Sequence, residues 1–158
     1  SDLAADIYST FFGVKTVFNE NQMTLKPVDY FVFPEKIILN MNDCPDIAQT
    51  VCVTATALKI PFEISGLGTL KVKETDRLAA LQNELKKIGA ETEITETSIK
   101  SLRFFEPEEN ISVKTYQDHR MAMSFAPFCL IKEMIIEDEN VVEKSYPEFW
   151  EDLSKLLI

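Results

Sequence analysis

Lys71-Val-Lys-Glu-Thr-Asp-Arg-Leu-Ala-Ala80 is the stretch around which the rest of the chain is organised, because it opens a predicted helix. Apolar side chains recur at steps of three and four residues, at Leu78, Leu81, Leu85 and Ile88. This spacing places them on one buried stripe of the helix. Gly89 follows as a left-handed cap, so we expect the helix to end there.

Cations crowd the start of this predicted helix, where the aligned backbone dipoles already make the end positive. Lys73 and Arg77 are four residues apart and share one helix face, with Glu74 beside them. A solvated, charged first turn is the ordinary explanation for such a run. Capping alone favours acidic residues at this position, however. The excess of cations therefore indicates that an anion binds between them.

The composition limits the kinds of protein this chain can be. With 158 residues, of which 46% are apolar, it can bury the core of one domain. We expect no membrane span, because no apolar run approaches the required length and no secretory signal opens the chain. A formal net charge of −10 argues against a nucleic-acid partner. The same charge repels anions, so a site for an anionic substrate must concentrate its few cations locally.

The cysteines indicate a reducing compartment. Cys44, Cys52 and Cys129 lack the spacing of a metal site or of a disulfide framework. Cys52 and Cys129 lie in apolar helical patterns and are predicted to be buried thiols. We therefore expect a cytoplasmic location.

An internal repeat sets the predicted fold. The segment from Gly13 to Met23 aligns with the segment from Gly89 to Ile99, at an offset of 76 residues. We expect strands at 36–40, 62–64, 111–114 and 134–136, and helices at 3–12, 45–58 and 118–130. Each unit then has the order strand, helix, strand, helix and hairpin. This pattern predicts an α+β lobe with its helices packed together inside.

Charged residues stand where each predicted helix begins: Asp46, then Lys73 with Glu74, then His119 with Arg120, and finally Lys144. Parallel helices would bring these starts to one face, where helix ends and cations together focus positive potential. Such a face suits a ligand with several carboxylates and phosphates, which Arg binds bidentately. Taken singly, Asp46 is also explained as a helix-dipole residue and His119 as a structural hydrogen-bonding residue.

Four segments in order resemble the 5-enolpyruvylshikimate-3-phosphate synthase family. They are Met41-Asn-Asp-Cys-Pro-Asp46, Lys71-Val-Lys-Glu-Thr-Asp-Arg-Leu78, Tyr116-Gln-Asp-His-Arg-Met-Ala-Met123 and Glu143-Lys-Ser-Tyr-Pro-Glu-Phe149. The resemblance implies that residues 1–158 are a single C-terminal lobe fragment of about two βαβαββ units, with the N-terminal lobe absent. It further implies an inside-out α/β barrel whose helices are parallel and point their N-termini at an inter-lobe cleft.

The resemblance also implies roles for individual residues. Asp46 matches the acid that contacts the shikimate 5-hydroxyl and acts as a base, and Lys73 matches a contact to shikimate 3-phosphate. Glu74 matches the acid that transfers a proton to the methylene carbon of phosphoenolpyruvate. The matches for phosphoenolpyruvate binding are Arg77, Arg120 and Lys144, with His119 near the same ligand. Thr69 stands where many members carry asparagine, although its hydroxyl can still form a hydrogen bond.

The implied reaction moves the enolpyruvyl group of phosphoenolpyruvate onto shikimate 3-phosphate, without a metal or an organic cofactor. We expect the chain to be inactive without the other lobe, and the protein to be a monomer. One alternative is the related UDP-N-acetylglucosamine enolpyruvyl transferase, which lacks the Lys-Glu-Thr-Asp-Arg pattern. The other is a non-catalytic, ligand-binding remnant, although such a remnant has no reason to keep Asp46, Glu74 and Arg120.

Overall fold

A computed structural model describes residues 2–72 and 76–157 of the chain. Its helices are α1 (Asp2–Phe12), α2 (Ala48–Ala57), α3 (Arg77–Lys87), α4 (His119–Phe125) and α5 (Phe149–Leu156). Its strands are β1 (Val14–Asn19), β2 (Gln22–Pro27), β3 (Ile37–Asn40), β4 (Phe62–Ser65), β5 (Ala90–Ile94), β6 (Ile99–Phe104), β7 (Ile111–Val113) and β8 (Met134–Ile136). Four short 3-10 helices are η1 (Pro45–Ile47), η2 (Gly68–Val72), η3 (Ala126–Leu130) and η4 (Glu139–Lys144).

One complete βαβαββ unit lies in the middle of the chain. Its strands form a four-stranded sheet in the order β3-β4-β6-β5, in which β3 and β4 are parallel and the other pairs are antiparallel. Phe62 and Ile64 point into the core and are fully buried, whereas Glu63 between them is exposed. This alternation is what a strand with one buried face requires.

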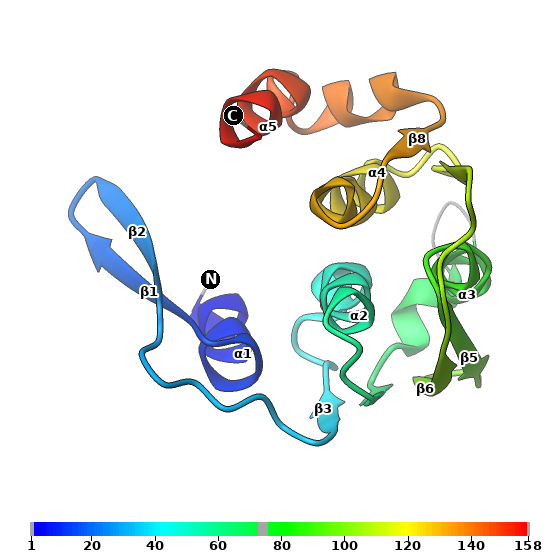
Figure 1. Ribbon diagram of the computed structural model, residues 1–158, viewed down its shortest axis with the longest axis horizontal. Coiled ribbons are helices and arrows are strands. Elements are labelled where there is room, and N and C mark those ends of the chain that lie inside the picture. The colour runs from blue at the N-terminus through cyan, green and yellow to red at the C-terminus, as the bar shows by residue number, and fades with distance from the viewer. Residues whose placement is uncertain (1, 73–75, 158) are drawn as a thin grey trace.

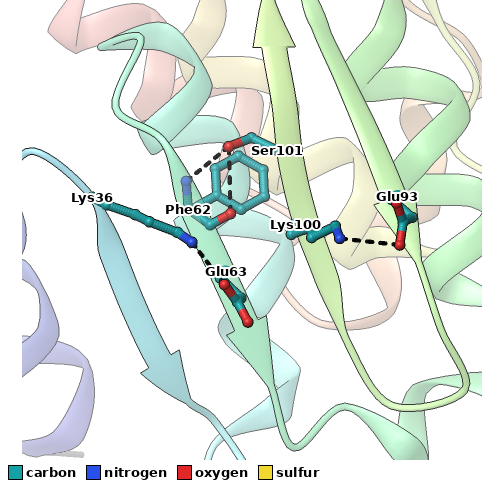
Figure 2. A network of polar contacts seen from close by, with 6 residues as sticks. All are labelled: Lys36, Phe62, Glu63, Glu93, Lys100 and Ser101. Carbon is teal, nitrogen blue, oxygen red and sulfur yellow. Dashed lines mark hydrogen bonds and ion pairs between the residues drawn. The ribbon is translucent and has the colours of Figure 1, made fainter.

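Polar contacts fasten the strands of this sheet to one another (Figure 2). Lys36 pairs with Glu63 at 2.7 Å, and Lys100 pairs with Glu93 at 3.2 Å. The Ser101 hydroxyl on β6 accepts a hydrogen bond from the Phe62 amide on β4 at 2.9 Å. Since the side chains of both ion pairs are about half exposed, we expect them to set the register of the sheet more than its stability.

The predicted repeat is present on both sides of the complete unit. Before it, α1 leads into the antiparallel β1–β2 hairpin, as α3 leads into β5–β6; after it, β7, α4 and β8 repeat β3, α2 and β4. The two glycines that end α1 and α3, Gly13 and Gly89, both have positive φ. Their carbonyls accept equivalent hydrogen bonds from Val28 and Phe105, at 2.8 and 2.9 Å.

The helices pack together in the interior, as the sequence predicted. Figure 1 looks nearly along the axes of α1, α2, α3 and α4, with the strands outside them. The predicted stripe of α3, Leu78, Leu81, Leu85 and Ile88, is buried. Hydroxyl groups also link the helices: Tyr8 meets Thr54 and Thr50 meets Ser124, both at 2.9 Å. The interior between α1, α2 and α4 thus contains paired polar groups as well as apolar side chains.

Several predicted boundaries and exposures were wrong. The helix predicted to start at Lys73 and Glu74 begins only at Arg77, where Asp76 caps it by accepting the Ala79 amide at 3.1 Å. The predicted helix 118–130 ends at Phe125, because Pro127 has no amide hydrogen to continue the ladder. Cys129 was predicted to be a buried thiol, but it is half-buried.

Lys144 was predicted to start a helix, and this too was wrong. It is the last residue of η4, and α5 begins five residues later at Phe149. Pro147 lies between the two elements, and a proline disfavours helical geometry in the residue before it. The dipole argument for a cation at a helix start therefore does not apply to Lys144.

Candidate functional site

Asp46 is the meeting point of three helix starts. Asp46 follows Pro45 in η1, the short 3-10 helix that directly precedes α2. Arg77, the first residue of α3, donates a hydrogen bond from Nη1 to Asp46 Oδ1 at 3.3 Å. The Nη2 of Arg120, the second residue of α4, lies 3.2 Å from Asp46 Oδ2. One carboxylate therefore holds two guanidinium groups that come from different helices.

Arg77 is fixed from its other side by a second, deeper carboxylate. Its Nε lies 2.5 Å from Asp118 Oδ2, and the two side chains are only 8% and 2% exposed. An ion pair this deep is costly to desolvate and is strongly destabilising to break, since one charge then stays buried without its partner. Arg77 is thus locked in place. Arg120 is 35% exposed and Asp46 is 40% exposed, so both remain within reach of a ligand.

Asp118 also shapes the start of α4. Its Oδ1 accepts the Arg120 amide at 2.9 Å as an N-cap, and its own amide donates to the Thr115 carbonyl at 2.9 Å. The two residues before it, Tyr116 and Gln117, both have positive φ, at 53° and 58°. Two successive non-glycine residues with left-handed backbone angles store strain, and such strained residues cluster at functional sites.

A buried glutamate holds the strained turn. Tyr116 donates its hydroxyl hydrogen to Glu84 Oε1 at 2.8 Å, and the Lys114 amide donates to Glu84 Oε2 at 3.1 Å. The Nζ atom of Lys87 lies 2.7 Å from Glu84 Oε2 and balances the charge of this carboxylate. Burial and the contact with Glu84 raise the pKa of Tyr116, so its phenol stays protonated as a donor. Through this cluster, α3 fixes the loop that presents His119 and Arg120.

A cleft of about 390 Å³ opens beside the Asp46–Arg120 pair. It is lined by Asp46, Ile47, Thr50, His119, Arg120, Met123, Ser124, Ser145 and Tyr146. Tyr146 donates its hydroxyl hydrogen to Asp152 at 2.5 Å, and this hydrogen bond raises the pKa of Tyr146. Hydroxyls, an imidazole and a guanidinium thus surround a space open to solvent. The donors suit an anionic, oxygen-rich ligand.

The structure brings together four of the residues predicted from the sequence: Asp46, Arg77, His119 and Arg120. It does not place Lys144 among the residues that line the cleft, although Ser145 and Tyr146 beside it do line it. Thr69 lies exposed in η2. The predictions for Lys73 and Glu74 fall outside the described residues.

Sequence reasoning missed Asp118 and Glu84 as members of this site. Asp118 carries one recognisable signal, because an aspartate directly before an apolar helical run is a common N-cap. Glu84 sits within the apolar stripe of α3, at 1% exposure, where a carboxylate requires a partner. Neither signal identifies the distant partners, Arg77 for Asp118 and Tyr116 for Glu84.

The described part of the chain contains no group of three or more His, Cys, Asp or Glu side chains arranged to hold a metal ion. Nor do residues 2–72 and 76–157 include a helix long and apolar enough to cross a membrane.

Comparison with known proteins gives consistent matches. The family described as EPSP synthase (3-phosphoshikimate 1-carboxyvinyltransferase) matches residues 16–153. A Bacteroides fragilis protein named 3-phosphoshikimate 1-carboxyvinyltransferase is 42% identical over 146 residues, which are 90% of this chain and 35% of that protein. A Mannheimia haemolytica protein of the same name is 35% identical over 163 residues, covering 99% of this chain and 35% of that protein. The chain thus spans about a third of the length of these relatives.

A solved structure shows the same fold. The EPSP synthase from Acinetobacter baumannii superposes with a TM-score of 0.64, over 92% of this chain and 36% of that one. The sequence identity of this pair is 21%, so the likeness supports the mixed helix-and-sheet fold alone.

Proposed function

This chain belongs to the EPSP synthase (3-phosphoshikimate 1-carboxyvinyltransferase) family, and from that premise we propose that it contributes one lobe of an enolpyruvyl transferase. The complete protein transfers the enolpyruvyl group of phosphoenolpyruvate to the 5-hydroxyl of shikimate 3-phosphate. A carbon–oxygen bond forms at C2 of phosphoenolpyruvate, the bond from C2 to the phosphate oxygen breaks, and phosphate leaves.

The observation that carries this proposal is the convergence of Asp46, Arg77 and Arg120 from three helix starts. Both substrates are anions, and the chain as a whole carries a charge of −10. Only a local cluster of cations can attract such ligands against this field. Arg120 is exposed enough to exchange Asp46 for a carboxylate or phosphate of the substrate, whereas Arg77 is held by Asp118 as a fixed charge.

The reaction needs one carboxylate that takes a proton and one acid that gives a proton. The attacking 5-hydroxyl loses its proton, and the methylene carbon of phosphoenolpyruvate gains one from the acid. When phosphate leaves, the resulting methyl carbon returns a proton to the same carboxylate, which restores the double bond of the enolpyruvyl group. We assign the base to Asp46, because its carboxylate lies among the cations that would bind the substrate anions and is exposed enough to reach a hydroxyl group. The acid is assigned to Glu74 from the family motif, with Lys73, His119 and Lys144 as further substrate contacts.

The rest of the protein supplies the other lobe and closes the site. Positioning two substrates lowers a barrier by roughly 7–11 kcal/mol in favourable cases, and one wall of a cleft cannot provide this. The isolated chain should therefore release no phosphate from the two substrates. We further propose that the complete protein acts as a cytoplasmic monomer.

The two alternative functions are distinguishable from this one. A UDP-N-acetylglucosamine enolpyruvyl transferase would use a nucleotide sugar as the acceptor in place of shikimate 3-phosphate. A non-catalytic remnant would bind phosphoenolpyruvate without turnover. Assaying phosphate release by the complete protein with each acceptor separates all three functions.

Steady-state kinetics of four variants of the complete protein test the assigned roles. Asp46→Asn and Glu74→Gln should each lower kcat by roughly a hundredfold or more, the usual scale for losing a general acid or base. Arg120→Ala and Lys144→Ala should mainly raise the KM for phosphoenolpyruvate.

Matched controls are Asp29→Asn and Lys59→Ala, since both residues are exposed and neither lines the cleft. Both control variants should behave as the parent protein does. A near-normal kcat for Glu74→Gln would remove the acid from this mechanism.

A further inference from the structure

Glu84 on α3 is a buried carboxylate that has no part in the proposed reaction. It is 1% exposed, and a charge this deep in the protein requires dedicated partners. Both of its oxygens accept hydrogen bonds from the loop that joins β7 to α4. Oε1 accepts from the Tyr116 hydroxyl at 2.8 Å, and Oε2 accepts from the Lys114 amide at 3.1 Å. One carboxylate thus bridges two residues of the same loop.

The loop has a second attachment to the same helix. Arg77 lies about two turns before Glu84 on α3 and contacts the carboxylate of Asp118. Residues at this spacing share one face of a helix, and here they hold the alternate loop residues Lys114, Tyr116 and Asp118. A loop attached at one point can pivot, whereas two attachments to one rigid helix fix its direction.

The direction of this loop determines where Arg120 lies. Asp118 caps α4 by accepting the Arg120 amide at 2.9 Å, and the side chain of Arg120 reaches Asp46 at 3.2 Å. Between the two attachments, Tyr116 and Gln117 both have positive φ. Non-glycine residues in this conformation persist only where the surrounding contacts over-determine them. Without the bond from the Tyr116 hydroxyl, the turn can relax and displace the start of α4.

We propose that Glu84 is a positioning residue of the anion site, which holds this strained turn in the conformation that presents Arg120 to a carboxylate or phosphate of the substrate. Glu84 is not among the residues that line the cleft, so it acts through the turn and not by touching the ligand. It therefore sets the affinity for the anion and not the rate of the chemical step. The inference deepens the proposed function and rests on it where the anion is phosphoenolpyruvate.

Tyr116→Phe in the complete protein tests the inference, because it removes only the hydroxyl and leaves Glu84 bonded to the Lys114 amide and paired with Lys87. The KM for phosphoenolpyruvate should rise roughly fivefold or more, since a hydrogen bond to a charged group is lost. The kcat should stay within about twofold of the parent value, and the KM for shikimate 3-phosphate should not change. In the Arg120→Ala background the same substitution should have no further effect, because it acts through Arg120.

Tyr8→Phe is the matched control. The Tyr8 hydroxyl on α1 meets Thr54 on α2 at 2.9 Å, so this variant also loses one hydroxyl contact between elements but leaves the loop before α4 intact. Both KM values should equal those of the parent protein. A merely structural role for the Tyr116 contact would lower kcat through a smaller folded fraction and leave KM unchanged. That result, or additive effects of Tyr116→Phe and Arg120→Ala on KM, would overturn the inference.

Hydrogen exchange separates this inference from the proposed function. The amides of Arg120 and Met121, which both donate to Asp118, should exchange faster in Tyr116→Phe and at the parent rate in Tyr8→Phe. If the parent protein releases no phosphate from the two substrates, the proposed function fails, and the Kd for inorganic phosphate replaces KM as the measure of the anion site. Unchanged exchange at these amides, or an unchanged affinity for the anion in Tyr116→Phe, contradicts the positioning role whatever reaction the protein performs.

Discussion

At the scale of single residues, Asp118 is the side chain whose change should reveal how the site is held. In Asp118→Asn the amide oxygen can still cap α4, but the charge that balances Arg77 is lost. Removing one partner of a buried ion pair costs about 3 kcal/mol, because the other charge stays buried. We expect this loss in the free energy of unfolding, measured with urea.

An exposed ion pair provides the comparison. Glu106 pairs with Lys59 at 3.5 Å, with side chains 89% and 61% exposed. Glu106→Gln removes one charge of this pair, as Asp118→Asn does for the buried pair, and should change the free energy of unfolding by less than about 1 kcal/mol. Equal losses from the two substitutions would contradict the locking role of Asp118.

The chemistry of the site could be predicted from single residues, but their pairing could not. Asp46, Arg77 and Arg120 stand out because each is a charge at the start of an apolar helical run. The ion pair of Arg77 with Asp118 joins residues far apart in the chain. No local pattern specifies such a contact, since it depends on how α3 packs against the loop before α4.

At the scale of elements, Gly89 is the position where the conformation of a turn depends on one residue. Its φ of +98° disfavours any side chain, and an added Cβ would collide with the Phe105 carbonyl oxygen. The link from α3 to β5 depends on this close approach, because Phe105 also donates its amide hydrogen to the Gly89 carbonyl. Gly89→Ala should therefore lower the free energy of unfolding by about 2 kcal/mol or more.

Gly68→Ala is the control for this prediction. The φ angle of Gly68 is not positive, and an added Cβ would lie 3.3 Å from the Cγ2 atom of Thr97. We expect a change of about 0.5 kcal/mol or less, measured by thermal and urea unfolding of both variants. If Gly68→Ala proves as damaging as Gly89→Ala, backbone conformation is not the cause.

Elements with a strong pattern were predictable and their ends were not. The β1–β2 hairpin, the strand Met134–Ile136 and the buried stripe of α3 follow from alternation, turn residues and helical spacing. The 3-10 pieces η1 and η3 were expected as parts of longer helices, and Lys144, which ends η4, was expected to start one. Prolines at 45, 127 and 147 determine where these helices begin and end, because a proline has no amide hydrogen for the helical ladder. The spacing of apolar residues carries no information about this missing hydrogen bond.

At the scale of the whole molecule, the sequence repeat predicted the most. The offset between Gly13 and Gly89 predicted a repeated unit that ends in a hairpin, with helices packed together inside, and both hairpins are present. The expectation that helix starts share one face is met by α2, α3 and α4, because Arg77 and Arg120 at the starts of α3 and α4 both contact Asp46 just before α2. It fails for Lys144, because this residue ends η4 and does not start a helix.

The shared helix starts also predict anion binding by the chain alone. Arg120 is the more exposed of the two cations at Asp46, so phosphate or sulfate should shift its side-chain NMR signal more than that of Arg77. Lys144 should respond only if the anion reaches beyond the Ser145 edge of the cleft. Because the site is open to water, its attraction for anions should fade as added salt shortens the Debye length below about 10 Å, near 0.1 M.

Arg103 is the internal reference for this titration, since it is 71% exposed, pairs with Glu91 and lies on β6 away from the cleft. Its signal should stay constant, and the Arg120→Gln variant should lose most of the response at the cleft. The net charge of −10 makes unspecific accumulation of anions elsewhere unfavourable, so a response confined to Arg77 and Arg120 reports a local site. Shifts of equal size at Arg103 and Arg120, or a response that survives high salt, would mean that the clustered helix starts do not form an anion site in this chain.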